Sequence, residues 1–399
     1  MAGPLKGIVV LDLTWAIAGP YATLLLRDLG AEVIKVEIPG AGDVTRYVPP
    51  YYRGEVSAYF LNTNRGKEAI TLNLKAEKGK AIFLRLVERA DILVESFRPG
   101  TMAKLGLSYP ELARQNPRLI YGAISGFGQT GPYSDRPAYD LVAQAMGGTM
   151  SVTGEEGGEP VKVGAFIGDL AASLYLVIGI LAALKEKEGS GEGQMVDVAM
   201  LDSQVALCIN PVSEYLATGE VPKPMGSRAF QVTPFQVFKT KDSRLAILTT
   251  DERQWEELCR VAQREDLLED PRFMNMQARN QNYQAFLPVF SEVMASRTNA
   301  EWEKDLKNTH IIFCPVYSID QVVQDPQVKA REMITEVKDE KRGGGSFRVV
   351  GNPIKLSRSQ EPLSGSIPEL GEDTDQVLSR FLGLSPQEIE RLRGEGIIY

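Results

Sequence analysis

The first 130 residues alternate between short hydrophobic runs and amphipathic segments, and this alternation constrains the fold more than any other feature of the chain. Strand-like runs occupy residues 7–13, 31–37, 69–74, 91–96 and 119–128, with helical patterns such as 21–30 between them. Hydrophobic strands that alternate with helices are typical of a parallel, doubly wound α/β sheet. Ligands bind such sheets outside the carboxyl ends of the strands. We therefore expect functional residues in 16–20, just after Leu74, and in 96–100.

Composition excludes several classes of protein. The 399 residues are 43% hydrophobic and carry a net charge of −8, as expected of an ordinary globular protein rather than a nucleic-acid binder or an anionic-membrane binder. We therefore expect no nucleic-acid partner and no membrane partner. The three cysteines are widely spaced and form no metal or disulfide pattern, and no signal peptide is evident at the start of the sequence. A cytoplasmic location is expected.

The second half of the chain differs from the first in its hydrophobic pattern and in its content of turn-forming residues. Residues 170–184 contain no charge, but 15 residues fall short of the roughly 20 that span a bilayer, so we expect a buried core helix there. Residues 218–231 are rich in turn-forming residues, and 232–330 read as a smaller α+β domain. A glycine-marked loop with strand signal is expected at 341–357, and a terminal helix capped by Ser385 at 384–396.

Familiar catalytic motifs are missing from the sequence. The stretch 38–46 does not match G-x-G-x-x-G, and neither a P-loop nor a G-x-S-x-G elbow is found. The only histidine, His310, cannot build a metal site alone and is expected to be structural. Catalysis is therefore expected to use carboxylates, hydroxyls, amides and basic groups.

Asp169 is the carboxylate whose position in the sequence points to a functional role. It directly precedes the uncharged run, where a helix would begin, and Gly168 precedes it. The positive end of a helix would lower the pKa of this carboxyl and keep it ionised. Gly168 would let a ligand approach and leave backbone N–H groups free for an oxyanion. A simple helix cap remains the alternative.

Basic residues follow several of the predicted strands. Lys75, Arg98, Lys104 and Arg136 lie in loops of the first half, where they could hold a phosphate-bearing ligand. Arg65 and Lys67 belong to the same class on weaker grounds. Solvated surface charge is the alternative for each of them.

Eight sequence blocks resemble the family III CoA-transferases, a family that includes α-methylacyl-CoA racemase and formyl-CoA transferase. They are LKGIVVLDLTWAIAGPYATLLLRDLGAEVIKVE, GAGDVTR, NTNRGKEAITLNL, ADILVESFRPG, GFGQTGPYSDRPAYDLVAQAMGG, GDLAASLY, DPQVKAREM and EIERLRGEGII. They follow one another in the family's order, and the match extends over essentially the whole chain. The resemblance implies a Rossmann-like large domain, a smaller α+β domain and an interlocked homodimer. It divides the chain into 1–220, a small domain at 221–330, and 331–399 returning to the large domain.

The resemblance also implies the chemistry. The aspartate of the G-D block, here Asp169, is the nucleophile of family III transferases and passes through aspartyl anhydride and aspartyl-CoA thioester intermediates. Coenzyme A or acyl-CoA is a substrate, a small carboxylic acid is the other substrate, and no prosthetic group is expected. Succinyl-CoA as donor and a dicarboxylic acid as acceptor are favoured.

The family's CoA-binding positions carry over residue by residue. They are Ala18, Leu72, Asn73, Leu74, Lys75, Ser96, Phe97, Arg98, Lys104, Arg136, Pro137, Ala138 and Tyr139. Ile17, Gly168 and Arg228 are expected at the acceptor side; Arg228 lies in GSRAFQVTPFQVF, where many dicarboxylate-using relatives have a histidine.

Two departures bear on the reaction. Formyl-CoA transferase has glutamine in place of Ile17 and arginine in place of Ile38, and this chain lacks that enzyme's glycine-rich flap, which predicts against oxalate and formate. The racemase branch uses a histidine where Tyr139 stands, and a tyrosine is a poor base at neutral pH. A transferase is therefore favoured over a racemase, and a non-catalytic CoA-binding subunit paired with a paralogous chain remains an alternative.

Overall fold

The computed structural model describes residues 3–52, 56–229, 232–339, 345–359 and 365–399. The chain forms two compact units. The first comprises Met1–Met150, Lys162–Gly219 and Gln327–Tyr399, and the second comprises Ser151–Val161 and Glu220–Pro326. Each unit is described by itself.

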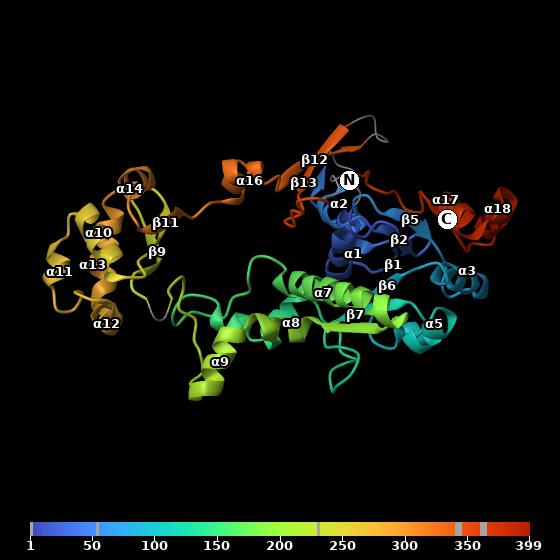
Figure 1. Ribbon diagram of the computed structural model, residues 1–399, viewed down its shortest axis with the longest axis horizontal. Coiled ribbons are helices and arrows are strands. Elements are labelled where there is room, and N and C mark those ends of the chain that lie inside the picture. Colours follow the sequence, from blue (N-terminus) through green and yellow to red (C-terminus); the bar gives the residue numbers. More distant parts are fainter. Residues whose placement is uncertain (1–2, 53–55, 230–231, 340–344, 360–364) are drawn as a thin grey trace. The chain divides into compact units, whose positions relative to one another are not determined.

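The first unit is built on a six-stranded parallel sheet in the order β5-β2-β1-β6-β7-β8 (Figure 1). Its strands are β1 (Val9–Leu13), β2 (Glu32–Glu37), β5 (Glu68–Thr71), β6 (Ile92–Glu95), β7 (Ile120–Ser125) and β8 (Met195–Ala199). The order runs outward in both directions from β1, as in a doubly wound sheet. The prediction of a parallel α/β fold is therefore confirmed.

Both faces of this sheet are covered by apolar side chains. In β1, Leu11 and Leu13 pack into one core, whereas Val10 packs into the other. The first core is completed by residues of α3 (Glu77–Val87), α5 (Tyr109–Gln115), α17 (Thr374–Leu382) and α18 (Pro386–Gly394). The second is completed by residues of α1 (Ala18–Asp28) and α7 (Ile167–Ser190). This two-sided burial explains why the strands read as nearly continuous hydrophobic runs.

Shorter elements surround the sheet of the first unit. They are η1 (Val44–Tyr47), β3 (Tyr51–Tyr52), β4 (Val56–Ser57), α2 (Ala58–Asn64), α4 (Thr101–Lys104), α6 (Asp140–Met146), α8 (Met200–Leu207), α9 (Ile209–Thr218), β12 (Ile334–Asp339) and β13 (Gly345–Val350). Two further short helices, η2 (Thr149–Val152) and α16 (Pro326–Ala330), lie where the chain passes from one unit to the other.

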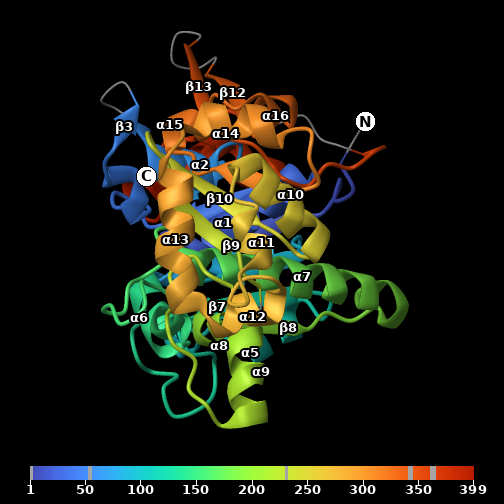
Figure 2. The ribbon, with the colours of Figure 1, turned by 90° about the vertical axis from the view of Figure 1, so that its left-hand side faces the viewer.

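The second unit combines a small antiparallel sheet with helices (Figure 2). The sheet contains β9 (Phe235–Lys239), β10 (Arg244–Leu248) and β11 (Ile312–Pro315), and the helices are α10 (Glu252–Ala262), α11 (Asp266–Glu269), α12 (Met276–Gln281), α13 (Tyr283–Ala295), α14 (Asn299–Leu306) and α15 (Ile319–Val322). Its core is aromatic, with Trp255, Phe286, Phe290 and Trp302 buried together. Its α+β composition is that of the predicted smaller domain, but its extent differs from 221–330, because it includes Ser151–Val161 and ends at Pro326.

Several element boundaries differ from the sequence-based expectation. Strand β5 ends at Thr71 rather than Leu74, because the Asn73 backbone N–H turns to donate to the carbonyl of Ile397 at 2.8 Å. Helix α7 begins at Ile167, two residues before Asp169. The Ser385 cap is confirmed, since its side chain accepts a hydrogen bond from the Glu388 N–H. Part of the loop predicted at 341–357 lies outside the described residues, and β13 occupies the next portion.

Helix α7 is longer than the uncharged run suggested. Its 24 residues are long and apolar enough to cross a membrane by length and composition alone, which the count of 15 residues did not predict. In the structure it packs against α1 and the strands β7 and β8, and 44% of its most apolar window is buried. The side chains of Ala172, Leu176 and Ile180 are inaccessible. The predicted role in the core therefore applies to one face of the helix.

Candidate active site

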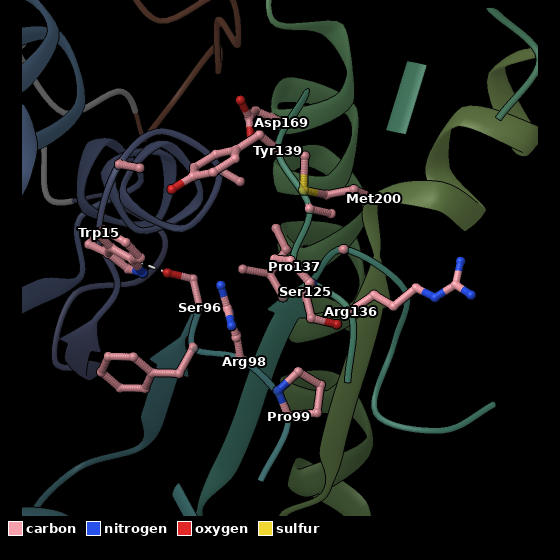
Figure 3. A pocket seen from close by; sticks show the side chains of 16 residues that line it. Trp15, Ser96, Arg98, Pro99, Ser125, Arg136, Pro137, Tyr139, Asp169 and Met200 are labelled. Carbon is pink, nitrogen blue, oxygen red and sulfur yellow. Dashed lines mark hydrogen bonds between the residues drawn. The ribbon is translucent and has the colours of Figure 1, made fainter. Parts of the chain in front are cut away.

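A cavity of about 220 Å³ opens at the carboxyl ends of β1, β6 and β7, within the first unit (Figure 3). Its wall includes Asp169 and eight of the residues expected to bind CoA, namely Ala18, Ser96, Phe97, Arg98, Arg136, Pro137, Ala138 and Tyr139. It lies where the ligand rule for parallel sheets predicts.

Seven further lining residues were not predicted individually. They are Trp15, Ala16, Pro99, Ile124, Ser125, Gly126 and Met200. Trp15, Ala16 and Pro99 lie in or beside the two loops expected at this edge, so their positions in sequence were the available signal. Ile124 to Gly126 close β7 and Met200 follows β8. Their approach to the site depends on the order of the strands, which the sequence does not state.

Asp169 lies in the first turn of α7, but it does not cap the helix. The N-cap position is Phe166, and no side chain caps it. Among the described residues, no hydrogen bond to the Asp169 carboxylate is found, whereas its backbone carbonyl accepts one from the Ser173 hydroxyl at 2.7 Å. The carboxylate is half-buried in the cavity wall. The alternative of a simple helix cap is therefore wrong, and the carboxylate oxygens remain available to a ligand.

Two buried side chains of α6 form hydrogen bonds with the backbone of the segment that leads to Asp169. Asp140 Oδ1 accepts a hydrogen bond from the Gly168 N–H at 2.7 Å, and Asp140 Oδ2 accepts one from Gln144 Nε2 at 2.6 Å. Gln144 Oε1 in turn accepts a hydrogen bond from the Val163 N–H at 2.8 Å. A β-carbon on Gly168 would lie 3.0 Å from Asp140 Oδ1. The absence of a side chain at 168 therefore permits this contact.

The electrostatics of Asp169 differ from the sequence-based expectation. Burial of the carboxyl, and secondly the negative charge of Asp140, raise the pKa of Asp169 to about 7. The prediction of a low pKa is wrong because desolvation of the carboxylate outweighs the attraction of the helix terminus. A carboxylate with a raised pKa is more basic and less hydrated than an ordinary one, which favours nucleophilic attack once it is ionised.

The predicted phosphate-binding residues fall into different environments. Arg98 and Arg136 line the cavity, and Arg136 extends away from the other labelled side chains in Figure 3, with its guanidinium 4.0 Å from the Tyr133 ring centroid. Arg65 and Lys67 are buried and pair with Asp28 and Asp12. The interpretation of these two residues as a phosphate site is wrong, because their charges are already neutralised in the core.

The remaining predicted residues do not line this cavity. Leu72, Asn73, Leu74 and Lys75 follow β5 beside the end of the chain, Lys104 is the exposed last residue of α4, Ile17 is the N-cap of α1, and Gly168 is buried against α6. Arg228 belongs to the second unit, where its guanidinium lies 3.5 Å from the Tyr283 ring centroid. Its expected contact with a carboxylate stays a prediction.

The surroundings of the only histidine, His310, are not those of a metal ligand. His310 is exposed in the second unit and contacts Glu257 through Nδ1 at 2.9 Å. In the part of the chain that the structure describes, no three histidine, cysteine or acidic side chains are grouped as a metal ion requires.

Comparisons with known proteins agree with this geometry. Residues 5–374 match CoA-transferase family III. The acetyl-CoA:oxalate CoA-transferase of Acetobacter aceti is 39% identical over 95% of this chain and 96% of its own length. The succinyl-CoA:mesaconate CoA-transferase of Haloarcula marismortui is 39% identical over 94% of this chain and 96% of its own. A crystal structure of a CaiB/BaiF family protein from Brucella suis superposes with a TM-score of 0.87 at 34% identity, covering 96% of this chain and all (100%) of the other.

Proposed function

The chain belongs to the family III CoA-transferases, and from that membership we propose that it moves CoA from succinyl-CoA to a dicarboxylic acid by way of covalent intermediates on Asp169. The observation that carries this proposal is the carboxylate of Asp169, which faces the cavity without a hydrogen bond among the described residues. No other carboxylate among the residues that the structure describes lines that cavity.

The proposed reaction splits one difficult exchange into four steps. An oxygen of ionised Asp169 attacks the thioester carbon of the donor, and CoA leaves as the thiolate, which yields a mixed anhydride. The thiolate then attacks the aspartyl carbonyl and releases the donor acid, leaving an aspartyl-CoA thioester. An acceptor carboxylate attacks this thioester and displaces CoA again, and the thiolate finally attacks the acceptor's carbonyl, which frees Asp169. Overall one thioester is exchanged for another, so no ATP is consumed, and the covalent intermediates divide the exchange into easier steps.

The residues that line the cavity, and the predicted residues outside it, are assigned distinct roles in this scheme. We assign Arg98, Ser96 and Phe97 to the CoA chain, and Pro137 to Tyr139 to the thioester end. Arg98 and Lys104 would meet the phosphates, because guanidinium and ammonium groups bind phosphate strongly. The residues Leu72 to Lys75, beside the end of β5, would receive the nucleotide. Ile17 and Arg228 remain proposed contacts of the acceptor acid.

The acceptor acid is the least determined part of the proposal. The mesaconate enzyme of Haloarcula is named for succinyl-CoA and a dicarboxylic acid, which supports the preferred class. The Acetobacter enzyme is named for oxalate, so oxalate belongs in any acceptor panel although Ile17 and Ile38 predicted against it. No prosthetic group is required by the proposed chemistry.

Mass spectrometry of the turnover mixture tests the proposal. Purified protein is given succinyl-CoA with a panel of mono- and dicarboxylic acids, and new CoA esters are identified. Hydroxylamine added during turnover should convert Asp169 to its hydroxamate, which peptide mapping locates. Asp169→Ala should abolish both signals, and full activity of this variant would refute the proposed nucleophile.

The same experiment separates two alternatives. A racemase would introduce solvent deuterium at the α-carbon of a branched acyl-CoA without any acceptor acid. A non-catalytic subunit would bind CoA, form no new ester, and become active only with a paralogous partner chain. Tyr139 at the position of the racemase histidine favours the transferase.

We further propose a cytoplasmic homodimer, with the chains interlocked as the family resemblance implies. Support comes from large apolar side chains left exposed on consecutive helices of the first unit, namely Leu174, Tyr175 and Ile178 in α7, Val205 and Leu207 in α8, and Ile209, Val212, Tyr215 and Leu216 in α9. Monomeric proteins rarely expose so many neighbouring apolar groups. Light scattering on the purified protein tests this: a mass near twice 43.9 kDa is expected.

A further inference from the structure

Two of the sequence blocks at the start of the chain carry charges that the proposed reaction does not use. AEVIKVE contains Lys35 and Glu37, and GAGDVTR contains Asp43. All three are buried, with exposed fractions of 0%, 6% and 3%. Burying a charge is costly unless it is paired and hydrogen-bonded, so such a cluster needs a reason beyond stability.

Lys35 and Asp43 form a buried ion pair that contacts the turn between β1 and α1 at two points. Lys35 Nζ lies 3.0 Å from Asp43 Oδ2 and donates a hydrogen bond to the carbonyl of Thr14 at 2.9 Å. Asp43 Oδ1 accepts a hydrogen bond from the Ala16 N–H at 3.3 Å. One ion pair thus holds both sides of Trp15. Since Lys35 comes from the middle of β2, the turn is tied to the rigid sheet.

Both the carboxylate and the backbone N–H of Asp43 are held by hydrogen bonds. Its Oδ1 accepts hydrogen bonds from the Thr45 N–H at 2.9 Å and the Thr45 hydroxyl at 2.7 Å. Its own N–H donates to Glu37 Oε1 at 2.7 Å, and Glu37 pairs with Arg46 at 2.6 Å. A continuous series of contacts therefore links the partly accessible Arg46, through Glu37 and Asp43, to the turn.

The turn that this pair holds has an unfavourable backbone conformation. Ala16 has a φ of +65°, in the left-handed region that residues with a β-carbon rarely adopt. Such a conformation persists only where its surroundings impose it. Trp15 and Ala16 both line the cavity, and the Trp15 N–H donates to Ser96 Oγ at 3.2 Å (Figure 3).

We propose that Lys35 and Asp43 are positioning residues that impose the strained shape of the Thr14–Ala16 turn and so form the cavity wall that receives acyl-CoA. The two residues do not contact the substrate; they act through Trp15, Ala16 and the adjoining Ser96. The proposal rests on the proposed function only in taking acyl-CoA as the ligand of this cavity.

A comparison of two buried ion pairs tests the proposal. Asp43→Asn and Lys35→Met break the pair that holds the turn. Asp28→Asn breaks the Asp28–Arg65 pair, which is equally buried, with contacts of 2.6 and 2.7 Å, and does not line the cavity. The measurements are thermal unfolding, the Kd for CoA by calorimetry, and amide hydrogen exchange of a peptide that contains residues 14–18.

All three variants should unfold at lower temperature, but only the first two should change the site. We expect Asp43→Asn and Lys35→Met to raise the Kd for CoA about tenfold and to accelerate exchange in the turn, since the strain released corresponds to roughly that factor. Asp28→Asn should leave both quantities as in the wild type. Equal CoA affinity and equal exchange in Asp43→Asn and Asp28→Asn would overturn the proposal.

A second substitution gives a specific rescue. Glycine adopts a φ near +65° without strain, so Ala16→Gly added to Asp43→Asn should recover at least about threefold of the lost CoA affinity. The same change added to Asp28→Asn should recover none. Recovery in neither background contradicts the proposed role of strain.

Milder variants cover the case in which Asp43→Asn does not fold. Thr45→Val removes one hydrogen bond from Asp43 and keeps both charges, and it should raise the Kd for CoA about threefold. An unchanged Kd and unchanged exchange in Thr45→Val would then overturn the proposal. Because CoA binding and exchange are measured without turnover, loss of the proposed reaction and loss of the positioning role give different results.

Discussion

Asp140 and Gly168 are joined by a hydrogen bond of 2.7 Å, donated by the backbone N–H of Gly168 to Oδ1 of Asp140. The same carboxylate whose charge raises the pKa of Asp169 therefore also fixes the backbone one residue before it. Burial of the Asp169 carboxyl is the larger cause of its raised pKa, but one buried side chain, Asp140, contributes both to the position and to the basicity of the proposed nucleophile. This coupling allows the two effects to be separated by substitution.

Removing the charge of Asp140 should move the pH profile of the enzyme. Asp169 must be ionised to attack, so kcat/KM should fall below about pH 7 in the wild type. Asp140→Asn keeps an oxygen that can accept from Gly168 but removes the negative charge, which lowers the pKa of Asp169 and shifts the acid limb to lower pH. The measurement is kcat/KM for succinyl-CoA from pH 5 to 9.

A matched control for this profile is Asp202→Asn, an exposed acidic residue in the first turn of α8 that does not line the cavity. It should leave the acid limb in place. An acid limb that stays fixed in Asp140→Asn, or moves to higher pH, would contradict the assignment of the limb to Asp169.

Adding a methyl group at Gly168 should displace the nucleophile. The new β-carbon would lie 3.0 Å from Asp140 Oδ1 and 3.2 Å from the Ala143 β-carbon, so the start of α7 must shift. A displacement of this kind costs about 100-fold in kcat where geometry controls the reaction. Steady-state kinetics of Gly168→Ala measure it.

Gly164→Ala is the control for that substitution, because a β-carbon at Gly164 meets no atom within 4 Å. It should retain wild-type kcat and KM. If Gly168→Ala is as active as Gly164→Ala, the geometry of the α7 terminus does not limit the reaction.

Neutralising Asp169 should stabilise the protein above neutral pH. The folded-state pKa of about 7 lies above the ordinary value of 3.8 for an aspartate, so folding favours the protonated carboxyl, and this contribution is lost as the pH rises toward and through 7. Asp169→Asn, which is never ionised, should therefore gain stability relative to the wild type, on the order of 2–4 kcal/mol at pH 8. Urea unfolding at pH 4 and pH 8 measures the difference.

At pH 4 the gain of Asp169→Asn should nearly vanish, because the wild-type carboxyl is then protonated in the folded protein. A gain that is equal at both pH values would mean that the amide stabilises by packing rather than by removal of charge. Loss of activity together with increased stability is the pattern expected of a functional residue.

Arg98 should contribute to CoA affinity through its charge. It is exposed at the cavity wall, where a charge-assisted hydrogen bond to phosphate is worth roughly tenfold or more in affinity. Arg98→Gln should raise the Kd for CoA by about that factor and weaken its dependence on salt concentration. Lys185→Gln, in the last turns of α7 and fully solvated, should change neither quantity. Equal behaviour of the two variants would remove Arg98 from the CoA site.

Much of the first unit could be predicted from hydrophobic periodicity. Strand β1 places Leu11 in one core and Val10 in the other, so its near-continuous apolar run already indicated a sheet covered on both faces. The rule that ligands bind at the carboxyl ends of parallel strands then identified the segments around Ala18 and Ser96. Gly168 and Asp169 were singled out because a carboxylate directly before an uncharged helical run is either a helix cap or a group accessible to a ligand, and the sequence left both open.

What the sequence determined by itself is the class of fold, the family and the position of Asp169 in the chain, because periodicity and motif order are local properties of the residues. The tertiary structure alone decided the state of that carboxylate. The pKa of Asp169 rises because folding removes its carboxyl from water and, secondly, because of the negative charge of Asp140, which lies 29 positions earlier in the sequence. Likewise Arg65 and Lys67 resembled surface charges until folding buried them against Asp28 and Asp12. Electrostatic environment depends on distances through space and on access to water, and neither is encoded in the spacing of residues along the chain.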